Sequence, residues 1–199
     1  GINRDLPLNY VERDSADTVL VNNLARNQHL VIYGSSKQGK TSLRKHCLQS
    51  DDYIVVHCSN KWTLDHLHEA ILKQAGFELT VSTMKATSGK QKILAKIKAG
   101  IFGSGIEGGA EAERTEENGV TKAPMELDTL DVNDIIAALK KINFSKYIVL
   151  EDFHYLPIDT QKDFSVALKA FHENSKLCFI IIGVWLEENM LLILESEYL

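Results

Sequence analysis

Four short apolar runs along the chain are predicted to be buried strands. They are rich in β-branched residues and bounded by polar residues or glycine, which is typical of strands covered on both faces of a parallel sheet. The runs cover residues 29–34, 53–58, 147–152 and 177–183. Their pattern predicts a mainly parallel central sheet.

Helical periodicity predicts helices between these runs. The second predicted helix has Thr63 as a suitable N-cap and Gly76 as a suitable stop. The predicted helices cover residues 40–49, 63–76, 131–142 and 160–174. Repeated strand–helix units of this kind favour a three-layer α/β fold with right-handed crossovers.

The strand–helix alternation stops between residues 79 and 130, a distance that exceeds an ordinary connection and predicts an insertion. Within it, residues 90–102 combine several lysines with Ile93 and Ile97 at helical spacing, which predicts a basic amphipathic helix. Such a helix could contact a membrane or a partner, whereas a solvated helix face is the simpler interpretation. The Gly-rich, acidic residues 103–119 predict a mobile loop.

Net charge and cysteine content limit the partners and the cellular compartment that we expect for the chain. A formal net charge of -5 over 199 residues argues against binding nucleic acid through bulk charge. The cysteines, at positions 47, 58 and 178, are too scattered for a disulfide framework, so we expect a reducing, cytoplasmic environment. The apolar residues 177–186 are too short to span a bilayer. Because no Met begins the chain and an apolar run ends it, we expect a piece truncated at its C-terminus.

A phosphate-binding loop is predicted directly after the first strand. The residues that fit the pattern G-x-x-x-x-G-K-[ST] are Gly34, Ser35, Ser36, Lys37, Gln38, Gly39, Lys40 and Thr41, followed by Ser42 in the first helical turn. The glycines allow backbone N–H groups at the helix N-terminus to face an anion. Lys40 is expected to reach the terminal phosphates and Thr41 to offer its hydroxyl to Mg²⁺, while Lys37 either approaches phosphate or faces water.

The third apolar run ends in two acids, Glu151 and Asp152, which offer two kinds of chemistry. In one interpretation Glu151 holds Mg²⁺ and Asp152 acts as the base that polarises the attacking water. Alternatively, Asp152 holds the metal and Glu151 points elsewhere, since neighbouring side chains on a strand face opposite ways. A third interpretation is that the acids only end a strand.

These motifs resemble the nucleotide-binding domain of the signal-transduction ATPases with numerous domains, the NACHT-like relatives of AAA+ ATPases in the additional-strand division of P-loop ATPases. An upstream box at residues 9–14 adds to the resemblance, because Tyr10, Val11 and Arg13 match a pattern that lies near the adenine in such proteins.

The resemblance implies a P-loop ATPase core over residues 29–199 with a long insertion, 79–130, before the acid-bearing strand, and an N-terminal segment and first helix over residues 1–28. It also implies ATP and ADP as ligands with Mg²⁺, slow hydrolysis, a homo-oligomer formed through the ATPase domain, and sensor and effector domains outside this chain. A γ-phosphate sensor is not expected after the fourth strand, which runs into Gly183, Val184 and Trp185 instead of a polar residue.

Three other functions remain open from the residues alone. A P-loop kinase would need an arginine-rich lid, and the acidic loop holds only Arg114. An AAA+ loader or remodeller of DNA or protein would need an arginine finger, and a nucleotide-binding module without turnover would need only the loop. Among the histidines, His66 and His68 lie on different helix faces and are expected at or near the surface, and His154 either positions a ligand or packs.

Overall fold

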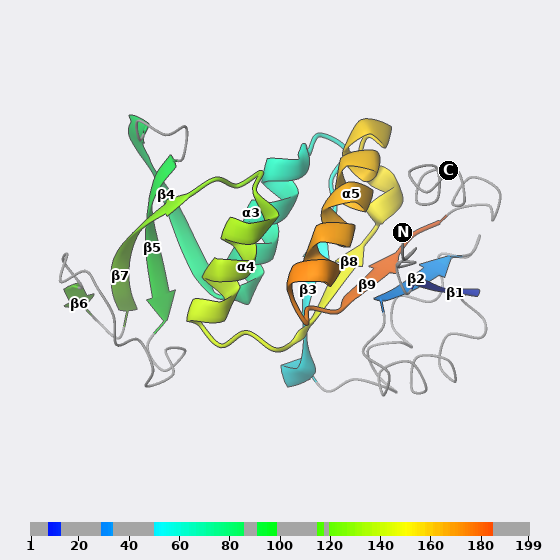
Figure 1. The fold of residues 1–199 in the computed structure, drawn as a ribbon, viewed down its shortest axis with the longest axis horizontal. Helices are drawn as coiled ribbons and strands as arrows, with labels where there is room; N and C mark the ends of the chain where they lie inside the picture. Colours follow the sequence, from blue (N-terminus) through cyan, green and yellow to red (C-terminus); the bar gives the residue numbers. More distant parts are fainter. Residues whose placement is uncertain are drawn as a thin grey trace. The chain divides into compact units, whose positions relative to one another are not determined.

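The computed structural model describes residues 8–12, 29–33, 50–85, 91–98, 115–117 and 120–184. The chain divides into two compact units (Figure 1). The first unit comprises residues 1–64 and 146–199, and the second comprises residues 65–145. Each unit has its own sheet, and each is described separately below.

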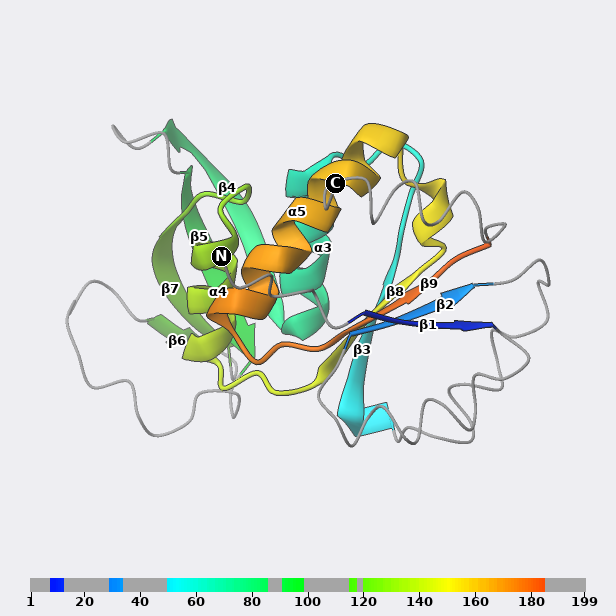
Figure 2. The ribbon, with the colours of Figure 1, turned by 45° about the vertical axis from the view of Figure 1, so that its right-hand side comes forward.

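The first unit contains a five-stranded sheet in the order β1-β2-β9-β8-β3, with every neighbouring pair parallel (Figure 2). Its strands are β1 (Leu8–Glu12), β2 (His29–Tyr33), β3 (Tyr53–His57), β8 (Tyr147–Glu151) and β9 (Phe179–Ile182), and a short 3-10 helix, η3 (Ser50–Asp52), precedes β3. The four predicted strands and the parallel α/β class are confirmed. Strand β1 was not predicted, because it is short and Asn9 interrupts its apolar residues.

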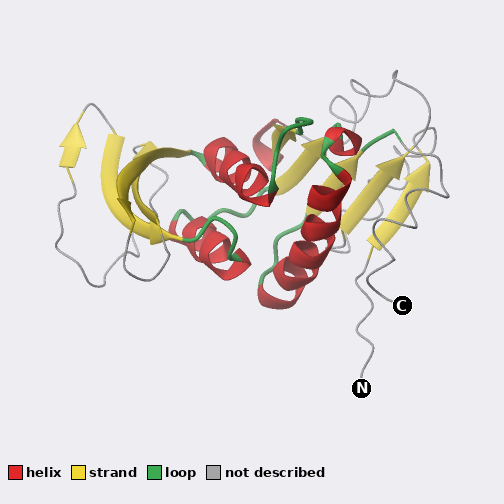
Figure 3. Cartoon of the chain, turned by 90° about the horizontal axis from the view of Figure 1, so that it is seen from above, coloured by secondary structure: helices red, strands yellow, loops and turns green. Residues whose placement is uncertain are grey.

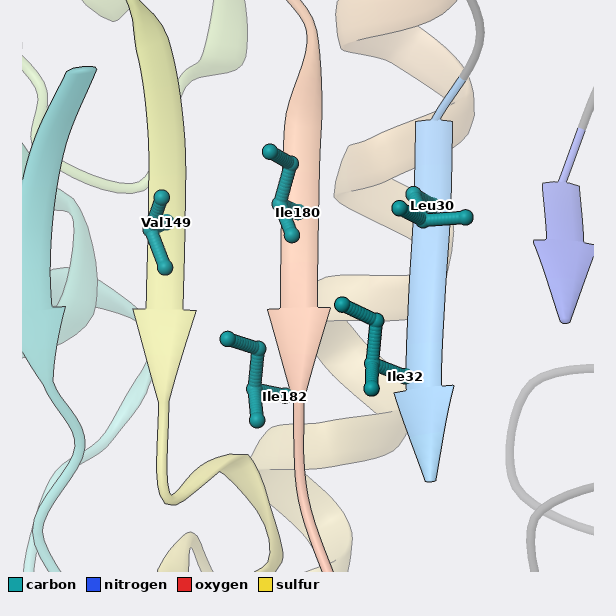
Figure 4. Close-up of a cluster of buried hydrophobic side chains, with 5 residues drawn as sticks. All are labelled: Leu30, Ile32, Val149, Ile180 and Ile182. Carbon is teal, nitrogen blue, oxygen red and sulfur yellow. The ribbon is translucent and has the colours of Figure 1, made fainter. Parts of the chain in front are cut away.

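One face of this sheet carries an apolar cluster made by alternate residues of three strands. Figure 4 shows its five side chains on β2, β9 and β8. They are Leu30, Ile32, Val149, Ile180 and Ile182, and all are buried. Partly buried Tyr53, Val55 and Tyr147 pack against them. Alternation along the strands places these residues on the same face.

Helix α5 (Ile158–Asn174) packs through aromatic rings on β9. Phe179 lies 5.5 Å from Phe164 and 5.1 Å from Phe171 between ring centroids, and all three are fully buried. Phe153, in the 3-10 helix η4 (Phe153–Tyr155), adds an edge contact to Phe164 at 5.6 Å. The helix predicted over 160–174 is therefore confirmed. The helix predicted over 40–49 lies outside the described residues, so the third layer stays a prediction.

The second unit contains a four-stranded antiparallel sheet in the order β4-β5-β7-β6 with helices α3 and α4 beside it (Figures 1 and 3). Its elements are α3 (Leu64–Ala75), β4 (Phe77–Lys85), β5 (Gln91–Lys98), β6 (Thr115–Glu117), β7 (Val120–Leu127) and α4 (Val132–Lys141). Both predicted helices are confirmed. Helix α3 ends before Gly76, whose φ of 118° strongly favours glycine.

Two polar contacts, one exposed and one buried, fix the start of α4. Asp131 is its N-cap, and its carboxylate accepts the Asn133 N–H at 2.9 Å. The fully buried His68 ring donates from Nδ1 to the Thr129 carbonyl at 2.6 Å. The expectation that His66 and His68 are both at or near the surface is therefore wrong for His68, while His66 is exposed.

The predicted basic helix over residues 90–102 is wrong where the structure describes it, because residues 91–98 form strand β5. Ile93 and Ile97 fit a period of two as well as helical spacing, and such short patterns do not separate the two structures. Strand pairing decides between helix and strand here. Strand β4 pairs with one edge of β5, with Val81 opposite Ile93, and β7 pairs with the other edge. An amphipathic membrane-contacting helix is thereby excluded for these residues.

An antiparallel sheet occupies much of the region that was predicted as an insertion, residues 79–130. The sheet begins at Phe77 and ends at Leu127, within the compact unit of residues 65–145. The predicted acidic loop includes β6, and its residues 103–114, 118 and 119 lie outside the described part. Among the residues that the structure describes, no helix has the length and apolar character needed to cross a bilayer.

Candidate active site at the carboxyl edge of the parallel sheet

The parallel strands bring their carboxyl ends to one edge of the first unit's sheet. Strand β2 ends at Tyr33, directly before the predicted phosphate loop, and β8 ends at Glu151. The register pairs Ile32 with Ile182, and Glu151 with His57. One strand, β9, separates β2 from β8. At the usual strand spacing, the acid strand lies roughly 10 Å from the strand that leads into the loop.

The strand order also creates a switch in chain direction at this edge. The connection leaving β2 passes β9 and β8 to reach β3, whereas the connection leaving β8 returns in the opposite direction to β9. In open α/β sheets, ligands bind outside the carboxyl ends of the strands at such a point. The topology therefore favours a ligand site beside the ends of β2 and β8.

Glu151 is a buried carboxylate next to an exposed imidazole. Its side chain is 3% exposed, and Oε2 lies 3.2 Å from Nδ1 of His57, whose side chain is 63% exposed. Glu151 continues the alternation of Tyr147 and Val149, so it lies on the face of the apolar cluster. A buried carboxylate needs polar partners, and the end of the neighbouring strand β3 supplies one.

Asp152 lies just outside β8 in a left-handed conformation, with φ 55° and ψ 36°. Such a backbone is uncommon for a residue other than glycine, although Asp tolerates it better than most. The turn continues into η4, where the Tyr155 N–H donates to the Asp152 carbonyl at 2.9 Å. Because the strand has ended, the argument that Glu151 and Asp152 face opposite ways does not apply to this pair.

Cys58 lies close to both acids, a position that sequence reasoning missed. Burial, and to a smaller extent the carboxylates of Asp152 and Glu151, together raise the pKa of its thiol to about 12. Its backbone N–H donates to the Glu151 carbonyl at 2.9 Å. The thiol is therefore protonated at neutral pH and adds no charge to the site. The sequence signal that could have located Cys58 at this edge is that it ends a predicted strand, directly after His57.

His154 joins the turn after the acids to the end of β9. The Val184 N–H donates to its Nδ1 at 3.1 Å, and its ring lies 4.4 Å from that of Tyr155 between centroids. Since Nδ1 accepts this hydrogen bond, the proton of the neutral ring belongs on Nε2. The sequence left two roles open for His154, which were positioning a ligand and packing. In the structure its ring accepts a hydrogen bond from the backbone of Val184.

The described residues include only some of the predicted site. Tyr10 and Val11 lie in β1, opposite Val31 and Ile32 of β2. Glu151 and Asp152 lie at the carboxyl edge. The remaining predicted site residues, Gly34 to Ser42 and Arg13, lie outside the described part of the chain.

A magnesium ion fits the chemistry of the acids at this edge. Mg²⁺ in nucleotide sites is commonly held by one or two carboxylates, water and substrate phosphates, without a cage of many protein ligands. Glu151 and Asp152 offer adjacent oxygen ligands of this kind. No group of three or more His, Cys, Asp or Glu side chains suited to a metal ion occurs within the described ranges.

No protein-family model matches this chain, and no curated protein sequence matches it. The structure and the residues themselves therefore carry the functional argument.

Proposed function

We propose that the chain binds Mg-ATP and hydrolyses it slowly, as the nucleotide switch domain of a larger signalling or defence ATPase. The observation that carries the proposal is the acid pair at the carboxyl edge of a parallel sheet, one strand away from the strand that enters the G-x-x-x-x-G-K-[ST] sequence. The position of β9 between β2 and β8 agrees with the additional-strand division that the motifs resemble.

The residues divide into two groups with different tasks. The loop from Gly34 to Thr41 would hold the phosphates through backbone N–H groups and the Lys40 ammonium. Thr41 and one of the acids would hold Mg²⁺, which neutralises charge on the phosphates when it is bound. The other acid would orient and polarise the attacking water. Asp152, which is half-buried, is the better placed of the acids to meet water, because Glu151 is buried.

A module that binds nucleotide without turnover is the second candidate. The short distance between Glu151 and His57 favours it, since a carboxylate engaged by an imidazole is less available to a metal or water. In an ATPase, the same contact would belong to a resting site, and nucleotide binding would have to displace it. Phosphate release therefore separates the two candidates.

Calorimetry with Mg²⁺ tests binding of ATP, ADP and GTP to the chain. We expect selective binding of adenine nucleotides and its loss in Lys40→Ala, because the lysine ammonium contacts the terminal phosphates. Lys73→Ala, at an exposed position of α3, is the matched control and should bind as the intact chain does. Tight binding by Lys40→Ala would contradict the assignment of the loop.

Phosphate release in parallel tests turnover. Asp152→Asn and Glu151→Gln preserve shape while removing the charge, so each should lower the rate about 100-fold or more if it acts on water or metal. Release by the intact chain no faster than background, with binding retained, would favour the module without turnover.

A further inference from the structure

The end of β9 is held on both sides by successive backbone amides. The Gly183 N–H donates to the Ile32 carbonyl of β2 at 3.1 Å, one residue before that strand ends. The next amide, that of Val184, donates to Nδ1 of His154 at 3.1 Å. Neighbouring amides along a strand point to opposite sides, so this pair connects the loop-bearing strand with the turn after the acids.

The His154 ring replaces a backbone acceptor that β8 no longer provides. Strand β8 ends at Glu151, and the left-handed backbone of Asp152 takes the chain out of the ladder. The Asp152 carbonyl accepts the Tyr155 N–H within the turn at 2.9 Å. The Val184 amide would lack the ladder's next acceptor, and the imidazole supplies one. The contact is partly buried, and an amide that is shielded from water without an acceptor costs free energy, which gives this contact a physical reason.

Hydrogen bonds also hold the end of the turn that leads into α5. The Leu156 N–H donates to the Phe153 carbonyl at 3.1 Å, and the buried Gln161 side chain donates from Nε2 to the Leu156 carbonyl at 2.8 Å. Helix α5 therefore holds one end of the turn, and His154 fixes its middle to β9.

We propose that His154 is a positioning residue that keeps Glu151 and Asp152 in register with the phosphate-loop strand through β9. This inference rests on the proposed function and gives His154 an indirect role, through its contact with Val184. Its contact sets how the acid turn sits relative to β2, because β9 is the one strand between them. Displacement of catalytic groups by about 1 Å can lower a rate about 100-fold.

Two substitutions at one position separate positioning from general stability. His154→Leu removes the hydrogen-bond acceptor and puts an apolar side chain of moderate size in its place. His154→Asn keeps an acceptor oxygen at the δ position, where it can receive the Val184 N–H. His66→Leu, the same change at an exposed histidine of α3, is the matched control.

Hydrogen exchange of the Val184 amide, followed by NMR in the absence of nucleotide, tests the contact itself. We expect slow exchange in the intact chain and in His154→Asn, and exchange at least about tenfold faster in His154→Leu, since loss of an acceptor weakens protection. Equal exchange in all three proteins would overturn the proposal.

Steady-state phosphate release tests the consequence of the contact. We expect kcat to fall about 10- to 100-fold in His154→Leu with KM for Mg-ATP changed less than about threefold, and to recover in His154→Asn. Unchanged kcat in His154→Leu, or equal losses in both variants, would overturn the positioning role. If the intact chain releases no phosphate, the proposed function fails instead, and Val184 exchange still decides whether His154 holds the strands together.

Discussion

A buried histidine at the start of β2 predicts that the first unit loses stability in acid. His29 is 1% exposed, and its Nδ1 accepts the Phe179 N–H at 3.1 Å. The ring of His172 on α5 meets it edge-on at 5.3 Å between centroids. Burial, and to a smaller extent the nearby charge of His172, together lower the pKa of His29 from 6.5 to about 4. The folded chain therefore keeps this ring neutral.

The sign and size of the effect follow from the two pKa values. Between about pH 6.5 and pH 4 the unfolded chain binds a proton at His29 that the folded chain does not, so stability falls as the pH drops through this window. Above the window the contribution is complete. A difference of about 2.5 pKa units corresponds to a loss of about 3 kcal/mol in the free energy of unfolding.

Urea denaturation of the chain and of His29→Asn between pH 7.5 and 4 measures this contribution. Asn cannot titrate but keeps an acceptor for the Phe179 N–H, so other acid-sensitive groups contribute equally to both curves. We expect the stability of the intact chain to fall relative to that of the variant by about 3 kcal/mol across the window. Parallel curves would refute the reasoning. His172→Gln should reduce the loss, because it removes the neighbouring charge that lowers the His29 pKa.

Three further outcomes test packing, capping and the site. Phe164→Ala should lower the free energy of unfolding by about 3–5 kcal/mol in denaturant titrations, because a fully buried ring leaves a cavity, and a loss below about 1 kcal/mol would contradict the packing of α5 on β9. Asp131→Ala should cost about 1 kcal/mol and Asp131→Asn much less, as judged by the same titrations, since the Asn133 N–H needs only a side-chain oxygen. Cys58 should react with a thiol reagent at pH 8 at least about tenfold more slowly than a free cysteine, as followed by mass spectrometry, because its raised pKa leaves little thiolate; rapid labelling in the folded chain would contradict this environment.

Local sequence patterns were sufficient to predict secondary structure where the spacing of apolar residues fitted either a strand or a helix alone. The β-branched runs that became β2, β3, β8 and β9 are too apolar to be exposed and too short for helices, so burial as strands was their only stable outcome. Gly76 after α3 marked a helix end through its positive φ, which acts within a few residues. The acid pair was likewise found from its place at a strand end.

Residues 91–98 show where local pattern was insufficient. Their isoleucines satisfy helix and strand spacing alike. Strand β4, which precedes them in the sequence, and β7, which follows them, supply the hydrogen bonds that select the strand. β-Structure depends on partners that are distant in sequence, so a single segment does not report them.

The sequence by itself determined the buried strands, the described helices of the alternating pattern and the chemistry offered by the loop motif and the acids. Only the tertiary structure decided which strands are neighbours. Pairing of β3 with β8 places His57 and Cys58 beside Glu151, and the position of β9 between β2 and β8 makes His154 the link between the acid turn and Val184. These contacts join residues that are far apart in the chain, so they depend on the order and register of the strands. Order and register are selected by the packing of the sheet as a whole, which no single segment reports.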